Sequence, residues 1–87
     1  MRIRKVVNGK LYDTGTATEI AANPFVDSFS DCYETLNRKK NGEFFRVYIN
    51  RDNTSCVIPV TLEEAQKICE DWLNGDDYME IFGPVEE

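Results

Sequence analysis

Residues 32–50 read CYETLNRKKNGEFFRVYIN, and the Asn-Gly pair in this stretch is the strongest fold signal in the sequence. A type I′ turn needs a positive φ at both central residues, and Asn-Gly adopts such angles at the lowest cost. The stretch therefore predicts a β-hairpin in which Cys32–Lys40 pairs with Glu43–Arg51 around Asn41 and Gly42.

Counting outward from this turn predicts the register, and the register predicts two chemically different faces. Leu36 is expected opposite Val47, and Arg38 opposite Phe45. The face expected to pack on the core carries Cys32, Leu36, Phe45, Val47 and Ile49. The other face mixes polar, basic and aromatic side chains: Tyr33, Thr35, Asn37, Lys39, Phe44, Arg46 and Tyr48.

A second Asn-Gly pair lies nearer the N-terminus. Asn8 and Gly9 predict a hairpin that joins Ile3–Val7 to Lys10–Thr14. The expected pairs are Arg4 with Asp13, and Val6 with Leu11.

The segments between and after the hairpins carry weaker signals. Thr18–Ala22 fits a strand or a helical turn, and the Asn-Pro pair that follows ends either one. Beyond it we expect a loop that packs on the core through Phe25, Val26 and Phe29. Cys56–Val60 reads as a short strand, and Pro59 favours a place at the edge of the sheet.

A helix is predicted to begin at Thr61, because Thr61 and Glu64 have the spacing of a capping box. Apolar residues then recur every three or four positions and build one stripe: Leu62, Ala65, Ile68, Cys69, Trp72 and Leu73. Asn74-Gly75 ends this helix, and Asp76–Phe82 predicts a second short helical turn.

These elements predict a single α+β domain that spans residues 1–87. Its core is an antiparallel sheet of four or five strands built from hairpins. The C-terminal amphipathic helix and the short helical turn after it pack on one face of that sheet.

Charge divides the chain into two unequal parts. The 10 Lys and Arg residues against 16 Asp and Glu give a net charge of −6. Residues 61–87 hold nine acids and one base, a balance of −8, whereas residues 1–60 hold nine bases and seven acids. Because net negative charge repels nucleic acid and anionic lipid, we expect neither direct nucleic-acid binding nor membrane association.

The acidic third of the chain is the first candidate binding surface. Carboxylates on a rigid helical frame imitate the phosphates of nucleic acid, so such a surface would compete for the basic groove of a nucleic-acid-binding protein. The candidate residues are Glu63, Glu70, Asp71, Asp76, Asp77 and Glu80. The same acids also suit an ordinary solvated helix face, and this alternative stays open.

Basic residues interleaved with aromatic ones on the predicted hairpin are the alternative binding face. Sheets that bind single-stranded nucleic acid combine these two residue types. The residues are Arg38, Lys39, Phe44, Arg46 and Tyr48. This face supports an alternative function, a small nucleic-acid-binding accessory protein, although a polar outer sheet face looks the same.

The sequence offers little for catalysis or metal binding. It has no histidine, which excludes Ser-His-Asp and Cys-His nucleophile pairs and histidine-containing zinc sites. An EF-hand with Gly75 at its sixth position would need an oxygen ligand at Trp72 and would end on Ile81, so that motif fails. We expect a protein that is not an enzyme, with no catalytic residue, metal or cofactor.

Cysteine usage and hydropathy predict the compartment. Cys32, Cys56 and Cys69 lack C-x-x-C spacing, and no signal peptide or long apolar run is recognised. We expect reduced thiols, packed as small hydrophobic side chains, in a soluble cytoplasmic protein. Exposed edge strands would permit a monomer or a weak dimer.

A resemblance to known proteins rests on turn, strand and cap motifs in four stretches. They are GKLYDTGTA (9–17), ETLNRKKNGEFF (34–45), IPVTLEEA (58–65) and GDDYMEIFG (75–83). Together they resemble small acidic proteins of Gram-positive phages and mobile elements, including anti-CRISPR-type inhibitors. The resemblance implies a non-enzymatic anti-defence inhibitor that works in the bacterial host cell, with a Cas9-type CRISPR effector nuclease as its protein partner.

Overall fold

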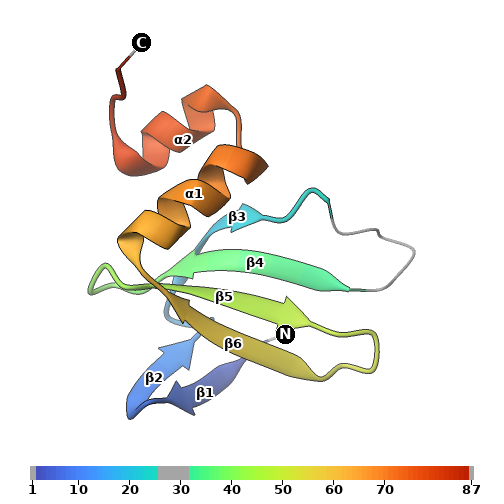
Figure 1. Ribbon diagram of the computed structural model, residues 1–87. Helices are drawn as coiled ribbons and strands as arrows, with labels where there is room; N and C mark the ends of the chain where they lie inside the picture. The colour runs from blue at the N-terminus through green and yellow to red at the C-terminus, as the bar shows by residue number, and fades with distance from the viewer. Residues whose placement is uncertain (1, 26–31, 87) are drawn as a thin grey trace.

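The computed structural model describes residues 2–25 and 32–86 and shows an α+β protein (Figure 1). Its elements are β1 (Arg4–Val7), β2 (Lys10–Asp13), β3 (Thr18–Ala22), β4 (Tyr33–Arg38), β5 (Phe44–Ile49), β6 (Ser55–Val60), α1 (Leu62–Trp72) and α2 (Gly75–Phe82). Strands β3 to β6 form an antiparallel sheet in sequence order, and β1 pairs with β2 in a separate two-stranded sheet. Both helices pack on the larger sheet, so the predicted fold class is confirmed.

The turn between β1 and β2 has the predicted geometry. Asn8 and Gly9 adopt positive φ angles of 51° and 76°, as a type I′ turn requires. The register is also confirmed, with Arg4 opposite Asp13 and Val6 opposite Leu11.

The turn between β4 and β5 differs from the prediction. Of the Asn-Gly pair, Gly42 alone takes a positive φ, 94°. The N–H of Gly42 donates to the carbonyl of Lys39 at 2.9 Å, and the N–H of Lys39 donates to the carbonyl of Glu43 at 2.7 Å. These bonds close a three-residue loop with a glycine bulge in place of the expected two-residue turn.

The longer loop shifts the register of β4 and β5 by one residue, so the predicted pairs are wrong. Because side chains alternate between faces, this shift separates Leu36 from Phe45 and Val47, with which it was expected to share one face. The observed pairs are Leu36 with Arg46, Arg38 with Phe44, and Thr35 with Val47.

Apolar side chains are consequently buried on both faces of the sheet. We call the face under α1 the helix face and the opposite one, which packs against the β1–β2 hairpin, the hairpin face. The helix-face core contains Ala21, Leu36 and Phe44 together with Ala65 and Cys69 of α1. The hairpin-face core contains Phe45 and Val47 together with Ile3 and Tyr12.

Helix α1 begins as predicted. The Thr61 hydroxyl accepts the N–H of Glu64 at 3.1 Å, and the Glu64 carboxylate accepts the N–H of Thr61 at 3.0 Å. Most of the predicted apolar stripe faces the sheet: Ala65 and Cys69 are fully buried, and Ile68, Trp72 and Leu73 pack beside them. Leu62, also predicted in the stripe, is instead 55 % exposed. Helix α2 follows after the N-cap Asn74, whose side chain accepts the N–H of Asp77.

Aromatic rings attach α2 to the rest of the fold. The Phe82 ring lies 5.9 Å from that of Phe44 on β5, and within α2 it lies 4.9 Å from the ring of Tyr78. These contacts matter because α2 has no fully buried residue of its own.

Two further expectations are corrected. Phe25 is 73 % exposed instead of packed on the core, because the Asn23 side chain accepts the N–H of Phe25 and forms a local turn; Val26 and Phe29 lie outside the described residues. Cys56 is exposed on β6, whereas Cys69 is buried as expected. β6 is an edge strand, as Pro59 indicated.

Candidate functional site

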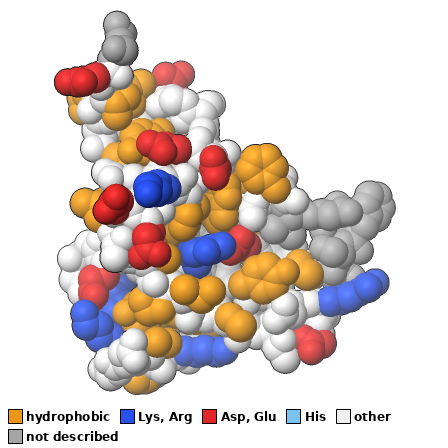
Figure 2. All heavy atoms as spheres, in the orientation of Figure 1, with side chains coloured by type: hydrophobic (Ala, Val, Ile, Leu, Met, Phe, Trp, Pro, Cys, Tyr) orange, Lys and Arg blue, Asp and Glu red, His pale blue; other side chains and the backbone are white. Residues whose placement is uncertain are grey.

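The acidic candidates gather on the two helices. We call them the acidic helical surface: Glu63, Glu70 and Asp71 on α1, with Asp76, Asp77 and Glu80 on α2. All six are exposed. Figure 2 shows acidic side chains spread over the helical part of the molecule, with a basic side chain among them. That part of the sequence holds one base, Lys67, whose Nζ lies 4.0 Å from a carboxylate oxygen of Glu63.

Helical geometry sets the spacing of these carboxylates. Glu63 and Glu70 are seven residues apart, so they lie on the same side of α1 about 10 Å apart along its axis. Asp76 and Asp77 occupy the first turn of α2, where the helix dipole favours negative charge. The carboxylates are therefore held on a rigid frame and face solvent.

Glu64 has a different role from its acidic neighbours. Its carboxylate accepts the backbone N–H of Thr61, and this hydrogen bond lowers the pKa of Glu64. Because the capping box occupies this carboxylate, Glu64 is not counted in the acidic helical surface.

A groove runs beside part of the acidic helical surface, where α2 lies next to Glu19 and Ile20 of β3. It has a volume of about 410 Å³. Glu19, Asp77 and Glu80 line it with carboxylates, and Arg38 lines it with a guanidinium. Its apolar lining comes from Ile20, Leu73 and Ile81. The groove therefore combines apolar side chains with an excess of negative charge.

The structure does not assemble the five residues of the alternative basic-aromatic face into one exposed platform. Phe44 is only 7 % exposed and packs under α2, so its ring is not open for stacking. Lys39 lies on the hairpin side of the sheet, where its Nζ is 4.0 Å from the centre of the Tyr12 ring and 3.4 Å from Glu43. The one-residue shift of register is the physical reason.

Arg46 of the same predicted face is already neutralised. Its guanidinium pairs with the carboxylate of Glu34 on the neighbouring strand, and the Glu34 side chain is only 7 % exposed. The other Glu34 oxygen accepts from Asn23 at 2.8 Å. Arg46 is therefore part of a structural ion pair and is poorly placed to meet a phosphate.

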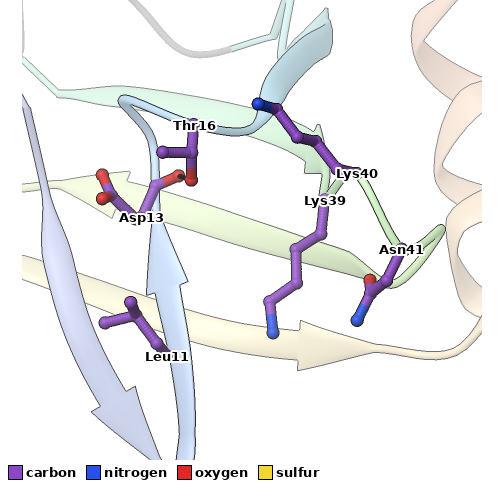
Figure 3. A pocket seen from close by; sticks show the side chains of 6 residues that line it. All are labelled: Leu11, Asp13, Thr16, Lys39, Lys40 and Asn41. Atoms are coloured by element: carbon purple, nitrogen blue, oxygen red, sulfur yellow. Dashed lines mark hydrogen bonds between the residues drawn. The ribbon is translucent and has the colours of Figure 1, made fainter.

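A shallow pocket of about 250 Å³ lies between the two hairpins (Figure 3). The amines of Lys39 and Lys40 point in different directions, and neither points at the carboxylate of Asp13. Asp13 is held instead by Arg2, whose Nε donates to it at 2.9 Å and whose guanidinium lowers its pKa to about 2. The pocket thus lacks the convergent charges that an anion site needs.

Residues 2–25 and 32–86 show neither a metal-binding cluster nor a membrane-spanning helix. In those ranges, His, Cys, Asp and Glu side chains form no cluster of three or more that could hold a metal ion. Neither helix there has the length and hydropathy of a membrane span.

The fold brings together two sets of residues that the sequence does not predict to be neighbours or buried. Glu19 joins Asp77 and Glu80 at the groove, although β3 lies about 60 positions away in the chain. Thr35 and Asn37 are buried on the hairpin face, where a strand partly open to solvent was expected. No local pattern in the sequence signals either arrangement, because both depend on register and packing.

Comparison with protein-family models, curated proteins and solved structures returns no match. The resemblance to phage and mobile-element proteins therefore stays a prediction.

Proposed function

We propose that this protein is a non-enzymatic anti-defence inhibitor that binds a CRISPR effector nuclease of the Cas9 type through the acidic helical surface. The observation that carries the proposal is the concentration of six exposed carboxylates on two adjoining helices, with Lys67 as the one base in that part of the sequence. The resemblance of the turn and cap motifs to anti-CRISPR-type proteins supports the choice of partner.

The charge and the size of the protein suit such a partner. Cas9-type effectors hold the guide–target duplex in a positively charged channel and read the adjacent DNA motif with arginines. An acidic protein is steered to such a channel and competes with DNA for it. The molecule measures 42 × 34 × 18 Å, so one face offers the roughly 800 Å² per partner that a specific interface needs.

The groove beside α2 gives the acidic helical surface a concave part that a side chain of the partner could enter. Asp77 and Glu80 belong both to the acidic helical surface and to the groove, and Ile20 and Ile81 provide apolar contacts there. An arginine side chain of the partner suits this combination, because its stem packs on apolar groups while its guanidinium meets carboxylates.

The alternative of direct nucleic-acid binding has less support. Its residues are divided between the two sheet faces, Phe44 is buried, and Arg46 is paired with Glu34. The acidic helical surface keeps all its carboxylates in solvent, although solubility alone would also account for exposed acids.

A cleavage assay tests the proposal. Purified Cas9-type effector with its guide RNA is mixed with the protein before target DNA is added. We expect cleavage to fall as the protein approaches excess over the effector. Full cleavage at a large excess would contradict the proposal.

Charge variants then test the surface. Glu70→Gln with Asp71→Asn should slow association roughly tenfold at low salt and weaken its salt dependence. Asp52→Asn with Glu86→Gln removes the same charge outside the surface and serves as the matched control. Equal association rates for the two double variants would place the interface elsewhere.

A further inference from the structure

A cavity lies on the hairpin face of the sheet, beside the chain that leads into and out of the β1–β2 hairpin. Its volume is about 200 Å³. Ile3, Val47 and Ile49 form its apolar walls. It faces away from α1 and α2 and is lined by none of the six residues of the acidic helical surface, although Glu19 lines both this cavity and the groove beside α2.

Two buried polar side chains line this cavity. Thr35 and Asn37 of β4 are only 4 % and 3 % exposed, although the residues opposite them on β5, Val47 and Phe45, are apolar. The Asn37 side-chain amide donates one hydrogen bond to the Thr35 hydroxyl at 2.9 Å. Buried polar groups normally have partners, so a polar pair at this position needs an explanation.

The bond between Asn37 and Thr35 does not use all the hydrogen-bonding groups of the Asn37 side chain. An asparagine amide has two N–H donors and a carbonyl acceptor. The bond to Thr35 uses one N–H, and the described part of the chain supplies no side-chain hydrogen bond to the carbonyl. Among residues 2–25 and 32–86, nothing else takes up the second N–H or the carbonyl of the Asn37 side chain, and both are available to another molecule.

The rim of the cavity carries a ring and a carboxylate. Tyr33 is half exposed, and its hydroxyl donates to Glu19 at 3.5 Å. Both side chains line the cavity, and none of the described residues that line it is a Lys or an Arg. A phosphate would meet Glu19 without any compensating base, so the chemistry favours an uncharged ligand.

The size and polarity of the cavity narrow the class of ligand further. Pockets for drug-sized ligands occupy about 300–1,000 Å³, so a cavity of about 200 Å³ suits a single small heterocycle. An asparagine amide pairs with adenine through two hydrogen bonds, accepting from the exocyclic amine and donating to the neighbouring ring nitrogen. Apolar walls and a tyrosine ring suit the faces of such a base.

We propose that this cavity binds an adenine-type base, free or as its nucleoside. Asn37 pairs with the amine and the adjacent ring nitrogen, and Val47 and Ile49 contact the ring. Tyr33 covers the ring at the rim, where Glu19 is placed to accept a hydrogen bond from a sugar hydroxyl.

An NMR titration of the full chain with adenine tests the proposal. We expect saturable amide shifts that centre on residues 35, 37, 47 and 49 at millimolar adenine or below. Hypoxanthine should bind roughly tenfold more weakly, because its carbonyl replaces the amine that the Asn37 carbonyl needs. Absent saturation, shifts centred on the helix face, or equal affinity for the two bases would each overturn the proposal.

Variants separate binding from folding. Asn37→Ala should abolish adenine binding, but Asn37 is buried and its loss also affects stability. Tyr33 is half exposed, so Tyr33→Ala should weaken binding several-fold while the melting temperature stays near that of the wild type. Tyr48→Ala removes a ring from the opposite face and is the matched control. Unchanged affinity in Tyr33→Ala, or a loss as large in Tyr48→Ala, would overturn the site.

Discussion

Arg46 on β5 places its guanidinium against the carboxylate of Glu34 on β4, on the helix face of the sheet. The two side chains are 33 % and 7 % exposed, so the pair is shielded from solvent on the Glu34 side. The Nε of Arg46 is buried and has no hydrogen-bond partner among the described residues. The carboxylate is therefore the main compensation for this charge.

Removing Glu34 should be costly for that reason. Glu34→Ala removes the main partner of a partly buried guanidinium, and we expect the free energy of unfolding to fall by about 2–3 kcal/mol. Urea unfolding measures the change. Replacing both partners together, as Glu34→Leu with Arg46→Leu, should cost less than the sum of the single changes; strict additivity would argue against the coupling.

Asp13 should make stability depend on acid pH. Arg2 lowers the pKa of this buried carboxylate to about 2, below its ordinary value of 3.8. A lowered pKa stabilises the fold above the unfolded-state value, and that contribution is lost as pH falls from about 4 toward 2. Asp13→Asn should therefore be less stable than wild type at pH near 7, with a difference that shrinks toward pH near 2. A constant difference across this range, measured by urea unfolding, would contradict the linkage.

Thr61 should contribute measurably as the N-cap of α1. Its hydroxyl accepts the N–H of Glu64, and an alanine leaves that donor unpaired. We expect Thr61→Ala to lower the free energy of unfolding by about 1 kcal/mol and Thr61→Ser to restore most of it. If the serine variant is as unstable as the alanine variant, the cap is not the cause.

Two glycines in open surroundings should respond oppositely to alanine. A Cβ would meet nothing within 4 Å at Gly42 or at Gly75, so sterics do not distinguish them. Gly42 has a φ of 94°, whereas Gly75 is the first residue of α2. Gly42→Ala should destabilise the fold by about 1 kcal/mol or more, and Gly75→Ala should be neutral or stabilising by about 0.5 kcal/mol. Thermal melts of the Gly42→Ala and Gly75→Ala variants measure the two changes in stability, and a loss of equal size in both would contradict this expectation.

Phe82 should affect partner binding without changing charge. Its ring packs against Phe44 of β5 and so holds α2, which carries half of the acidic helical surface, on the sheet. Phe82→Ala should cost about 2 kcal/mol of stability and weaken inhibition of the effector nuclease. Met79→Ala changes an exposed apolar residue on the same helix and is the control. Equal inhibition by the two variants would show that the position of α2 does not matter.

Most of the fold could be predicted because its signals are local. The Asn8-Gly9 turn and the Thr61 cap involve backbone angles or hydrogen bonds within a few residues, so sequence spacing is enough to place them. The sequence predicts the Asn41-Gly42 turn at the correct position, but with a loop that is one residue too short. The two loop types share the same residues, and packing on both faces of the sheet decides between them.

The candidate sites divide in the same way. The acidic helical surface could be predicted, since helical spacing and an excess of acids are visible in the chain. The groove and the cavity could not, because Glu19 meets Asp77, and Asn37 lines a cavity with Ile3, only through contacts between distant segments.

The sequence by itself determined the order of hairpins and helices and the sign of the charge on the helical end, because turns, caps and charges act over a few residues. The tertiary structure decided which face of the sheet each side chain of β4 and β5 occupies. A difference of one residue in loop length exchanges those faces, and only burial against α1 and the β1–β2 hairpin selects one arrangement.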